Sequence, residues 1–534
     1  MEPHRIESLR DPAAYPERPD AVEIVQTHLS VVCLVGGVAY KLKKSIRLPF
    51  ADFSTLESRR AYCEEECRLN RRLCPDIYLS VVPLRRRADG GLTFDPDSIG
   101  EIVDHAVKMR RMPAERMLDV LLAEDRVDAA DIRRIARQMV AFHRGAERGP
   151  EVLDWGSPQK LAAFALANFD EARAAVGSLF SAPLFAALEA RTRDDFARCL
   201  PRLLSRAASG HVVDGHGDLH ARNICLIDPP AIYDCIEFAP AFRCGDVATE
   251  HAFLVMDLRH RGQPELAAAY LDEVVQESGD AGIREVLPPL LRYRAMVRAK
   301  VSAIAASEAE LDNDARATAA EAARQYLRLA AATAVEDDGP WWLMFCGLPG
   351  SGKSSIAAAL TVAAGGAWPV LASDPIRKEL AGTNATKTLP ASCYTVAFSH
   401  RVYDEMIRRA VAATAPGRVI VLDANFRERD SRERAIDAAH EAGARVALLA
   451  VETDEATIIS RLHRREADLS ASVSDAGREV YRRLRDQFEA PAVTEADRFL
   501  TVSGSDPASV AAESVLADLL AGSVPKKRLP PNQI

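Results

Sequence analysis

His216-Gly-Asp-Leu-His-Ala-Arg-Asn223 has the pattern HxDxxxxN, and Gly347-Leu-Pro-Gly-Ser-Gly-Lys-Ser354 has the pattern GxxxxGKS. The two patterns belong to unrelated ways of positioning a phosphoryl group for transfer. Each predicts a site that uses ATP and Mg²⁺, and each does so by a different physical route. The chain of 534 residues is therefore expected to hold two nucleotide sites in two different folds.

The first pattern contains the side chains that a hydroxyl kinase needs. Asp218 is a carboxylate that can orient an acceptor hydroxyl and take its proton, so we predict it as the catalytic base. Asn223, five residues on, can turn back and bind Mg²⁺. Asp234 follows the short apolar run Ala231-Ile-Tyr and supplies a second oxygen ligand for the metal. The sequence therefore predicts a base and two metal ligands within one short segment.

A lysine and a glutamate further upstream complete this first site. Lys41 lies in the apolar run Val38–Leu42, where a strand would aim its ammonium group at the α- and β-phosphates. A glutamate on the helix expected at residues 56–73 should pair with this lysine. Glu66 is the favoured partner, and Glu65 is the alternative. These elements, taken in order, outweigh the interpretation of each residue as an ordinary turn or strand-edge residue.

At these residues the chain resembles the aminoglycoside phosphotransferase-like branch of the protein-kinase-like fold. The resemblance implies that His216 braces the catalytic loop, that Asp246 anchors it, and that a hinge near Asp104–Met109 receives adenine. The chain departs from protein kinases because Gly36-Gly37 replaces a longer glycine-rich loop. In addition, Asp234 is followed by Cys-Ile-Glu, with no activation segment after it. These departures favour a small-molecule kinase.

The second pattern has the sequence context that a phosphate-binding loop requires. It follows the apolar run Trp341–Cys346 and precedes a helix expected to begin at Ser355. Glycines let consecutive N–H groups point at the β- and γ-phosphates, and the helix adds its positive end. A lysine supplies fixed positive charge, and a serine hydroxyl ligates Mg²⁺. The predicted nucleotide-binding residues are Gly347, Gly350, Gly352, Lys353, Ser354 and Ser355, of which Ser354 is also the metal ligand.

Three further segments carry candidate residues for this second site. Asp374, after the second expected strand, could activate an acceptor hydroxyl, and Arg377, one turn later, could hold the acceptor or its phosphate. Asp423, after the third expected strand, could hold the water shell of Mg²⁺. A basic helical stretch could close as a lid and neutralise charge on the transferring group, or it could be a solvated helix face. The candidate lid arginines are Arg461, Arg464 and Arg465.

Residues 341–505 resemble a P-loop kinase group that includes polynucleotide 5′-hydroxyl kinases, zeta-toxin-like kinases and gluconate-kinase-like enzymes. The shared piece is Ser373-Asp-Pro-Ile-Arg377. AAA+ machines match less well, because the segment is short and shows no arginine-finger pattern. Over residues 22–505 the chain resembles a bacterial class in which an aminoglycoside phosphotransferase-like protein is fused to an ATP-binding P-loop protein. The resemblance implies ATP use and names neither acceptor.

The order of the expected elements predicts an α+β protein-kinase-like bilobal domain followed by an α/β P-loop domain with a parallel sheet. A hairpin is expected in the first lobe, from Ile24–Val35 to Val38–Leu42. Glu336-Asp-Asp-Gly-Pro340 is predicted as the linker before the P-loop domain. The predicted boundaries are 1–108 for the N-terminal lobe, 109–335 for the helical lobe and 341–524 for the P-loop domain.

Composition limits the partners and the compartment. The net charge of −9 favours neither nucleic acid nor an anionic membrane, and no apolar run predicts a membrane span. The charged, Pro-rich start is unlike a signal peptide, and the ten scattered cysteines are expected to be reduced. A cytoplasmic protein is therefore predicted, with ATP, Mg²⁺ and small-molecule hydroxyl acceptors as its ligands.

Two alternatives stay open at this point. The first domain could bind nucleotide only as a regulatory module, without catalysis. The P-loop domain could be a polynucleotide 5′-hydroxyl kinase in nucleic-acid repair, with Tyr394, His400 and Arg401 as surface candidates. The charge balance of that domain does not favour nucleic acid as the substrate. The sequence makes no prediction of the oligomeric state.

Overall fold

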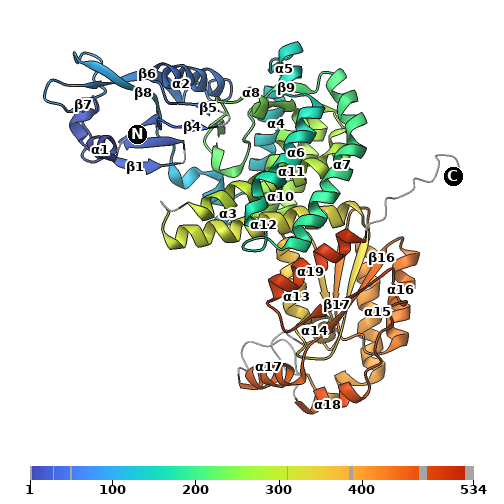
Figure 1. Ribbon diagram of the computed structural model, residues 1–534. Coiled ribbons are helices and arrows are strands. Elements are labelled where there is room, and N and C mark those ends of the chain that lie inside the picture. Colours follow the sequence, from blue (N-terminus) through green and yellow to red (C-terminus); the bar gives the residue numbers. More distant parts are fainter. Residues whose placement is uncertain are drawn as a thin grey trace. The chain divides into compact units, whose positions relative to one another are not determined.

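The computed structural model of the protein describes residues 3–27, 29–48, 51–308, 311–383, 389–467 and 478–522. The chain divides into two compact units (Figure 1). Unit 1 consists of Met1–Ala163, Cys199–Arg261 and Glu265–Leu290, and unit 2 consists of Phe164–Arg198, Gly262–Pro264 and Leu291–Ile534. The domain boundaries expected from the sequence stay predictions, and the expected end at residue 524 lies outside the described residues.

Unit 1 begins with a six-stranded antiparallel sheet in the order β1-β2-β3-β8-β6-β7. Its strands are β1 (Glu23–Gln26), β2 (Ser30–Val35), β3 (Val38–Lys43), β6 (Tyr78–Arg86), β7 (Leu92–Thr93) and β8 (Glu101–Arg110). Helix α2 (Leu56–Asn70) packs against β6 and β8 (Figure 1). The expected hairpin around Gly36-Gly37 joins β2 to β3, but the run 24–35 forms two paired strands instead of one.

The adenine hinge was expected near Asp104–Met109, but these residues lie within strand β8 and not in a connection between elements. This strand lies between β3 and β6 in the sheet. Asp104 is buried, and its carboxylate accepts a hydrogen bond of 2.7 Å from Nε of Arg59 on α2. Strand β8 ends at Arg110, so a connection from the sheet to the following helices begins only after that residue.

The rest of unit 1 is helical, with short strand pairs inserted between the helices. The helices include α3 (Leu118–Ala123), α4 (Ala129–Gly145), α5 (Pro150–Trp155), α8 (Pro240–Arg243), α9 (Val247–His260) and α10 (Pro264–Ser278). The short strands are β9 (Val212–Asp214), β10 (Ile224–Cys225), β11 (Ala231–Ile232) and β12 (Cys244–Asp246). Helix α9 is buried on every side along almost its whole length, which makes it a fixed support for the loops around it.

Unit 2 contains a five-stranded parallel sheet in the order β14-β15-β13-β16-β17. Its strands are β13 (Trp341–Cys346), β14 (Val370–Ala372), β15 (Val419–Asp423), β16 (Arg445–Glu452) and β17 (Arg498–Ser503). The helices after β13 are α13 (Lys353–Ala363), α14 (Ser373–Leu380), α15 (Val396–Ala413), α16 (Arg429–Glu441), α17 (Glu455–Ala467), α18 (Arg478–Asp486) and α19 (Ala508–Ala521). The predicted parallel sheet at the carboxyl-terminal part is confirmed.

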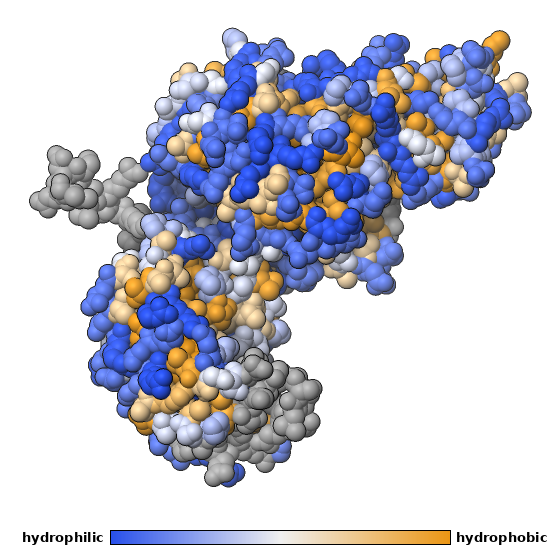
Figure 2. All heavy atoms as spheres, turned by 180° about the vertical axis from the view of Figure 1, so that it is seen from behind, coloured by the Kyte–Doolittle hydropathy of each residue, from blue (hydrophilic) through white to orange (hydrophobic). Residues whose placement is uncertain are grey.

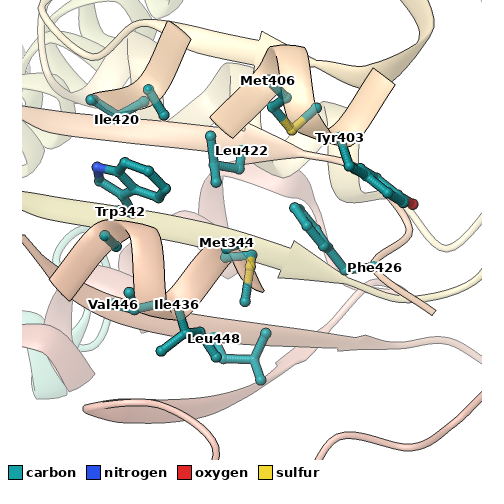
Figure 3. Packing of buried hydrophobic residues seen from close by; sticks show 14 of the residues in the cluster. Trp342, Met344, Tyr403, Met406, Ile420, Leu422, Phe426, Ile436, Val446 and Leu448 are labelled. Carbon is teal, nitrogen blue, oxygen red and sulfur yellow. The ribbon is translucent and has the colours of Figure 1, made fainter. Parts of the chain in front are cut away.

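Helices cover both faces of this sheet: α13 and α19 lie on one face, and α15 and α16 lie on the other (Figure 1). Every residue of β13 is buried, as expected for a central parallel strand with two covered faces. Figure 3 shows Trp342 and Met344 of β13 packed among side chains of β15, β16 and α15. This packing fixes the end of β13, from which the phosphate-binding loop leaves the sheet.

The segment expected as a linker is tightly bound within unit 2. Helix α12 (Asn313–Asp337) runs into it. The guanidinium group of Arg191 pairs with the carboxylates of Asp337 at 3.0 Å and Asp338 at 2.6 Å. Glu336 accepts a hydrogen bond of 2.8 Å from the indole of Trp368. The carboxylates of this segment therefore form ion pairs and hydrogen bonds with other parts of unit 2, although Asp337 is also exposed to solvent.

Hydrophilic side chains are interspersed with smaller apolar groups over the face seen in Figure 2. Within the described ranges, no helix has both the length and the apolar character needed to cross a membrane. All ten cysteines lie in the described part of the chain, are buried and are not joined in disulfides; their reduced state stays a prediction.

Candidate active sites

The first candidate site lies in unit 1 and is built around Lys41 on β3. Its ammonium group donates a hydrogen bond of 2.8 Å to Oε1 of Glu66 on α2 and a further bond to the carboxylate of Asp234. Glu65 instead pairs with Arg68 at 2.7 Å, so the structure brings Glu66 and not Glu65 to the lysine. Burial would lower the pKa of Lys41, but Asp234 and Glu66 outweigh it and raise this pKa well above its usual range.

The two expected metal ligands lie side by side at one end of a short hairpin. Asn223 directly precedes β10 and Asp234 lies two residues beyond β11, and the amide of Tyr233 donates a bond of 3.0 Å to the carbonyl of Asn223. Asp234 has a left-handed φ of 64°, an unusual conformation for a residue other than glycine. Its side chain is 42% exposed, so its carboxylate remains accessible to a cation.

Asp218 lies beside these ligands in the loop that follows β9. The side-chain amide of Asn223 donates bonds of 3.0 Å to both the carbonyl and Oδ2 of Asp218. The imidazole of His216 accepts a bond of 3.3 Å from the amide of Asp218, and its Nε2 lies 3.0 Å from the carbonyl of Tyr233. Burial lowers the pKa of His216, against the opposing effect of Glu250, so a neutral ring with its proton on Nε2 fits both bonds.

The carboxylate that anchors this loop is Glu250, which the sequence analysis missed. Its Oε1 accepts bonds from the amides of His216 and Gly217, the latter at 2.7 Å, and its Oε2 lies 2.7 Å from Nε2 of His143. Asp246, the anchor expected from the family resemblance, instead caps helix α9 and pairs with Arg206. That expectation was therefore wrong by one helical turn.

Helix α9 supports the loop through three side chains that share one face. Glu250 is the first. Phe253 packs its ring against His220 with the centroids 5.5 Å apart, and Asp257 accepts a bond of 2.9 Å from the amide of Ala221. Their spacing of three and four residues is visible in the sequence and is the signal that could have identified them. The loop leaves no room for a larger residue at Gly217, where a Cβ would lie 2.8 Å from the carbonyl of Phe242.

The second site is the loop between β13 and α13 in unit 2. Three of its residues have positive φ angles, as a tight phosphate-binding loop requires: Gly347, Gly350 and Gly352. Lys353 is 7% exposed, and its ammonium group donates bonds of 2.9 Å and 2.8 Å to the carbonyls of Gly347 and Leu348. Ser354 and Ser355 occupy the first turn of α13. The loop therefore has the strand, turn and helix that cradle phosphate groups.

Two side chains brace this loop from outside. Thr453 donates a hydrogen bond of 2.8 Å to the carbonyl of Ser351. Arg461, one of the expected lid arginines, donates bonds to the carbonyls of Gly504 at 2.8 Å and Gly350 at 3.4 Å. In this structure the guanidinium group of Arg461 thus joins the loop's backbone at Gly350 to the backbone of Gly504, which follows β17.

The other two lid candidates differ in what the structure describes. Arg464 is exposed on α17. The side chain of Arg465 lies outside the described residues, although its backbone belongs to the same helix. A lid made of these arginines stays a prediction.

Asp374 and Asp423 lie at the carboxyl ends of neighbouring strands, next to the phosphate-binding loop. Asp423 ends β15, which is adjacent to β13, and it pairs in register with Ala372 at the end of β14. Asp374 lies in the first turn of the helix that follows β14. The structure therefore brings both carboxylates to the sheet edge from which the loop leaves.

Arg377 is directed into the body of unit 2. Its Nη1 donates bonds to the carbonyl of Cys393 at 2.7 Å and to the hydroxyl of Ser399 at 3.3 Å, and its guanidinium lies 5.1 Å from the ring centroid of Tyr394. Its buried Nε has no hydrogen-bond partner. The donor capacity of this guanidinium group is therefore only partly used by the protein.

A second residue missed from the sequence is Arg432 of α16, which is fully buried. It pairs with both carboxylate oxygens of Glu495, at 2.6 Å and 3.1 Å, and donates a bond of 3.0 Å to the carbonyl of Phe426. This arginine fixes the loop that follows Asp423. Its partner lies 63 residues away in the chain, so no local pattern could have revealed its role.

Comparison with protein families matches residues 343–491 to the model AAA_33, described as an AAA domain. The family description carries the name AAA. From the sequence, AAA+ machines matched less well, because the segment is short and shows no arginine-finger pattern. The matched range includes the phosphate-binding loop, Asp374 and Asp423. The carboxyl-terminal part of the chain is therefore a P-loop domain with a parallel sheet.

The chain is similar to an uncharacterized protein of Mycobacterium tuberculosis (strain ATCC 25618 / H37Rv). The two are 29% identical over 412 residues, which cover 76% of this chain and 78% of the relative. An uncharacterized protein of Mycobacterium bovis matches to the same extent. The alignment is longer than either unit's part of the chain, so the likeness is not confined to the P-loop domain.

Three solved structures also resemble parts of the chain. A gluconokinase from Sinorhizobium meliloti is 20% identical and covers 34% of this chain and 93% of its own, with a TM-score of 0.26. The APS kinase CysC of Mycobacterium tuberculosis is 19% identical, with coverages of 34% and 99% and a TM-score of 0.26. The aminoglycoside phosphotransferase APH(3'')-Id from Streptomyces rimosus is 19% identical, with coverages of 52% and 92% and a TM-score of 0.31.

Proposed function

We propose that the protein is an ATP- and Mg²⁺-dependent phosphotransferase with two sites. Unit 1 contains a protein-kinase-like bilobal fold that acts as a small-molecule hydroxyl kinase of the aminoglycoside phosphotransferase-like kind. Unit 2 contains a P-loop kinase. The observation that carries the proposal is the bonding of Lys41 to both Glu66 and Asp234, because it joins a strand, a helix and a metal-binding loop in the arrangement that phosphoryl transfer from ATP needs.

The donor atoms of unit 1 fit a magnesium ion. Asn223 and Asp234 offer amide and carboxylate oxygens, the hard ligands that Mg²⁺ prefers, and the Asp234 side chain is partly exposed. In unit 2 the corresponding oxygens are those of Ser354 and Asp423. When bound, the ion neutralises negative charge on the phosphates.

Asp218 acts as the base of the first site. Asn223 fixes one of its carboxylate oxygens through a bond of 3.0 Å, which orients the other oxygen toward an acceptor hydroxyl. The loop that holds Asp218 is fastened by Glu250 and His216, so little reorganisation is needed on substrate binding. Lys41, freed from Asp234, binds phosphate oxygens while Glu66 keeps its orientation.

Asp374 acts as the base of the second site. It lies in the first turn of helix α14, at the carboxyl end of the sheet beside the loop, where an acceptor hydroxyl can approach the γ-phosphate. Lys353 supplies fixed positive charge, and the loop amides supply hydrogen bonds to the phosphates. The three arginines Arg461, Arg464 and Arg465 are proposed as a lid, with Arg461 leaving its backbone carbonyls on closure.

A polynucleotide 5′-hydroxyl kinase is the second candidate for unit 2, with unit 1 as a nucleotide-binding regulatory module. The observation that favours it is Tyr394, which is 37% exposed and lies over the guanidinium group of Arg377. An aromatic ring can stack on a nucleic-acid base, and a cation beside the ring can bind the neighbouring phosphate. The formal net charge of the chain does not favour this candidate.

The test uses the full chain and γ-labelled ATP. Wild type, Asp218→Asn and Asp374→Asn proteins are incubated with a library of small hydroxyl compounds and, separately, with 5′-hydroxyl oligonucleotides. We expect labelled small molecules from both sites, with each variant losing only one class of product. Labelled oligonucleotides as the sole product would favour the second candidate, and no labelled product in wild type with any acceptor would contradict the proposal.

A further inference from the structure

A second lysine, Lys43, lies two residues after Lys41 on strand β3. Side chains two residues apart on a strand share one face, so both lysines point toward helix α2. The ammonium group of Lys43 donates a bond of 2.6 Å to Oε2 of Glu66, while Lys41 occupies Oε1. Each oxygen of the Glu66 carboxylate thus has its own lysine, which fixes the rotation of the carboxylate about its last bond.

Lys43 also pairs with Glu237, three residues after Asp234 in the metal-binding loop. Glu66, Lys43 and Glu237 are respectively 0%, 2% and 8% exposed. Burial would favour neutral carboxyl groups, but the two lysines lower the pKa of Glu66 to about 2. A buried network of this kind is stable only while every member is paired.

The loop from Asp234 to Glu237 is attached to its surroundings at successive residues. The amide of Cys235 donates a bond of 2.9 Å to the side chain of Asn70, and the amide of Ile236 donates one of 3.1 Å to the carbonyl of His216. Glu237 closes the loop through Lys43. The segment Cys-Ile-Glu, where protein kinases have Phe-Gly, therefore carries an ionic attachment of its own.

Lys43 does not reach a nucleotide, because its ammonium group is enclosed by two carboxylates and the ring of Phe53, whose centroid is 5.6 Å away. Its contacts lead instead to the two residues that would bind phosphate and metal. Through Glu66 it sets the direction of Lys41, and through Glu237 it sets the position of Asp234. Both effects act on the same pair of partners, Lys41 and Asp234.

We propose that Lys43 and Glu237 are positioning residues that fasten the metal-binding loop to the Lys41–Glu66 pair and so keep the first nucleotide site preorganised. This inference rests on the function proposed for unit 1. Without Lys43, Glu66 is free to rotate and the loop loses its attachment to β3. A displacement of about 1 Å at Lys41 or Asp234 is enough to lower binding and turnover by about 10–100-fold.

The experiment measures Mg²⁺·ATP affinity in the full chain, with Lys353→Ala present throughout to silence the second site. The variants are Lys43→Met, Lys43→Arg and the double variant Lys43→Met/Glu237→Gln. Lys44→Met is the matched control, because Lys44 is the next lysine on the chain and lies beyond the end of β3. Isothermal titration gives the dissociation constant, and thermal unfolding of unit 1 gives the stability.

We expect Lys43→Met to weaken ATP binding by about 10–100-fold and to lower the melting temperature. The double variant should regain most of the melting temperature, because it no longer buries a Glu237 carboxyl group without its partner, but it should not regain the affinity. Lys43→Arg should recover part of the affinity. Lys44→Met should have the same affinity and melting temperature as the protein that carries Lys353→Ala alone.

Recovery of both stability and affinity in the double variant would overturn the inference, because Lys43 would then serve only to neutralise Glu237. Unchanged affinity in Lys43→Met, or an equal loss in Lys44→Met, would also overturn it. A Lys353→Ala background protein that binds no Mg²⁺·ATP would instead contradict the function proposed for unit 1. The two failures are therefore distinguishable.

Discussion

Replacement of Glu250 by Gln should loosen the loop that carries Asp218. Burial would raise the pKa of Glu250, but its hydrogen bonds with His143 and with the amide of Gly217 help to lower it to about 2. A carboxyl group whose pKa falls from 4.5 to about 2 on folding contributes about 3 kcal/mol at neutral pH, since each pH unit corresponds to about 1.4 kcal/mol. Glutamine keeps the shape of the side chain and removes this contribution.

The direction of the pKa shift determines the pH range in which Glu250 stabilises the loop. Because the folded-state pKa of Glu250 is depressed, its contribution is present above pH 4.5 and is lost as the pH falls toward about 2. Glu250→Gln should therefore destabilise the loop at pH 7 and have little effect near pH 2. The difference between wild type and variant should shrink over that acidic window.

Hydrogen exchange of the peptide that covers residues 212–223 is the assay, because the chain has two units and global unfolding need not follow two states. At pH 7 the amides of His216 and Gly217 should lose about 100-fold of their protection, which corresponds to about 3 kcal/mol. Glu265→Gln, an exposed glutamate on α10, is the control and should change nothing. Equal protection in wild type and Glu250→Gln would refute the reasoning.

Three further changes test other parts of the account. Asp218→Asn should lower kcat of the first site by about 10²–10⁴-fold with little change in the KM for ATP, as steady-state kinetics would show; full activity would remove its role as base. Asp374→Asn should leave ATP affinity of unit 2 near wild type and cut acceptor phosphorylation by about 10²-fold, and a large loss of ATP binding would place Asp374 in the nucleotide site instead. Arg191→Ala should lower the local stability around residues 330–340 by about 1–3 kcal/mol in hydrogen exchange, because Asp338 loses this partner while Asp195 keeps Arg292; unchanged exchange would show that Arg191 adds no stability.

The parallel sheet of unit 2 could be predicted because its strands are continuous apolar runs covered on both faces. Strand β8 was not predicted, because Asp104 interrupts its apolar pattern. The partner of Asp104 is Arg59, 45 residues away, and only the folded chain brings them together. The ion pairs of the predicted linker were hidden for the same physical reason, since the carboxylates of Asp337 and Asp338 pair with Arg191, nearly 150 residues earlier.

In the candidate sites, too, residues fixed by a local pattern could be predicted, and residues fixed by contacts between distant segments could not. Side chains whose spacing is set by one motif, such as Asp218 and Asn223, could be placed from the sequence alone. The choice between Asp246 and Glu250 as the loop anchor depends on which turn of α9 faces the loop, and that is fixed by packing around the buried helix. Lys43 was missed because its partners, Glu66 and Glu237, come from two distant segments.

The chain is proposed to hold two separate Mg²⁺·ATP sites, and the number of nucleotides bound per chain distinguishes two sites from one. Equilibrium dialysis of the full chain with a non-hydrolysable ATP analogue and Mg²⁺ should give two bound nucleotides per wild-type chain. Lys41→Ala and Lys353→Ala should each leave one, and the double variant should leave none. A single bound nucleotide in wild type, or the loss of both nucleotides in either folded single variant, would contradict the account.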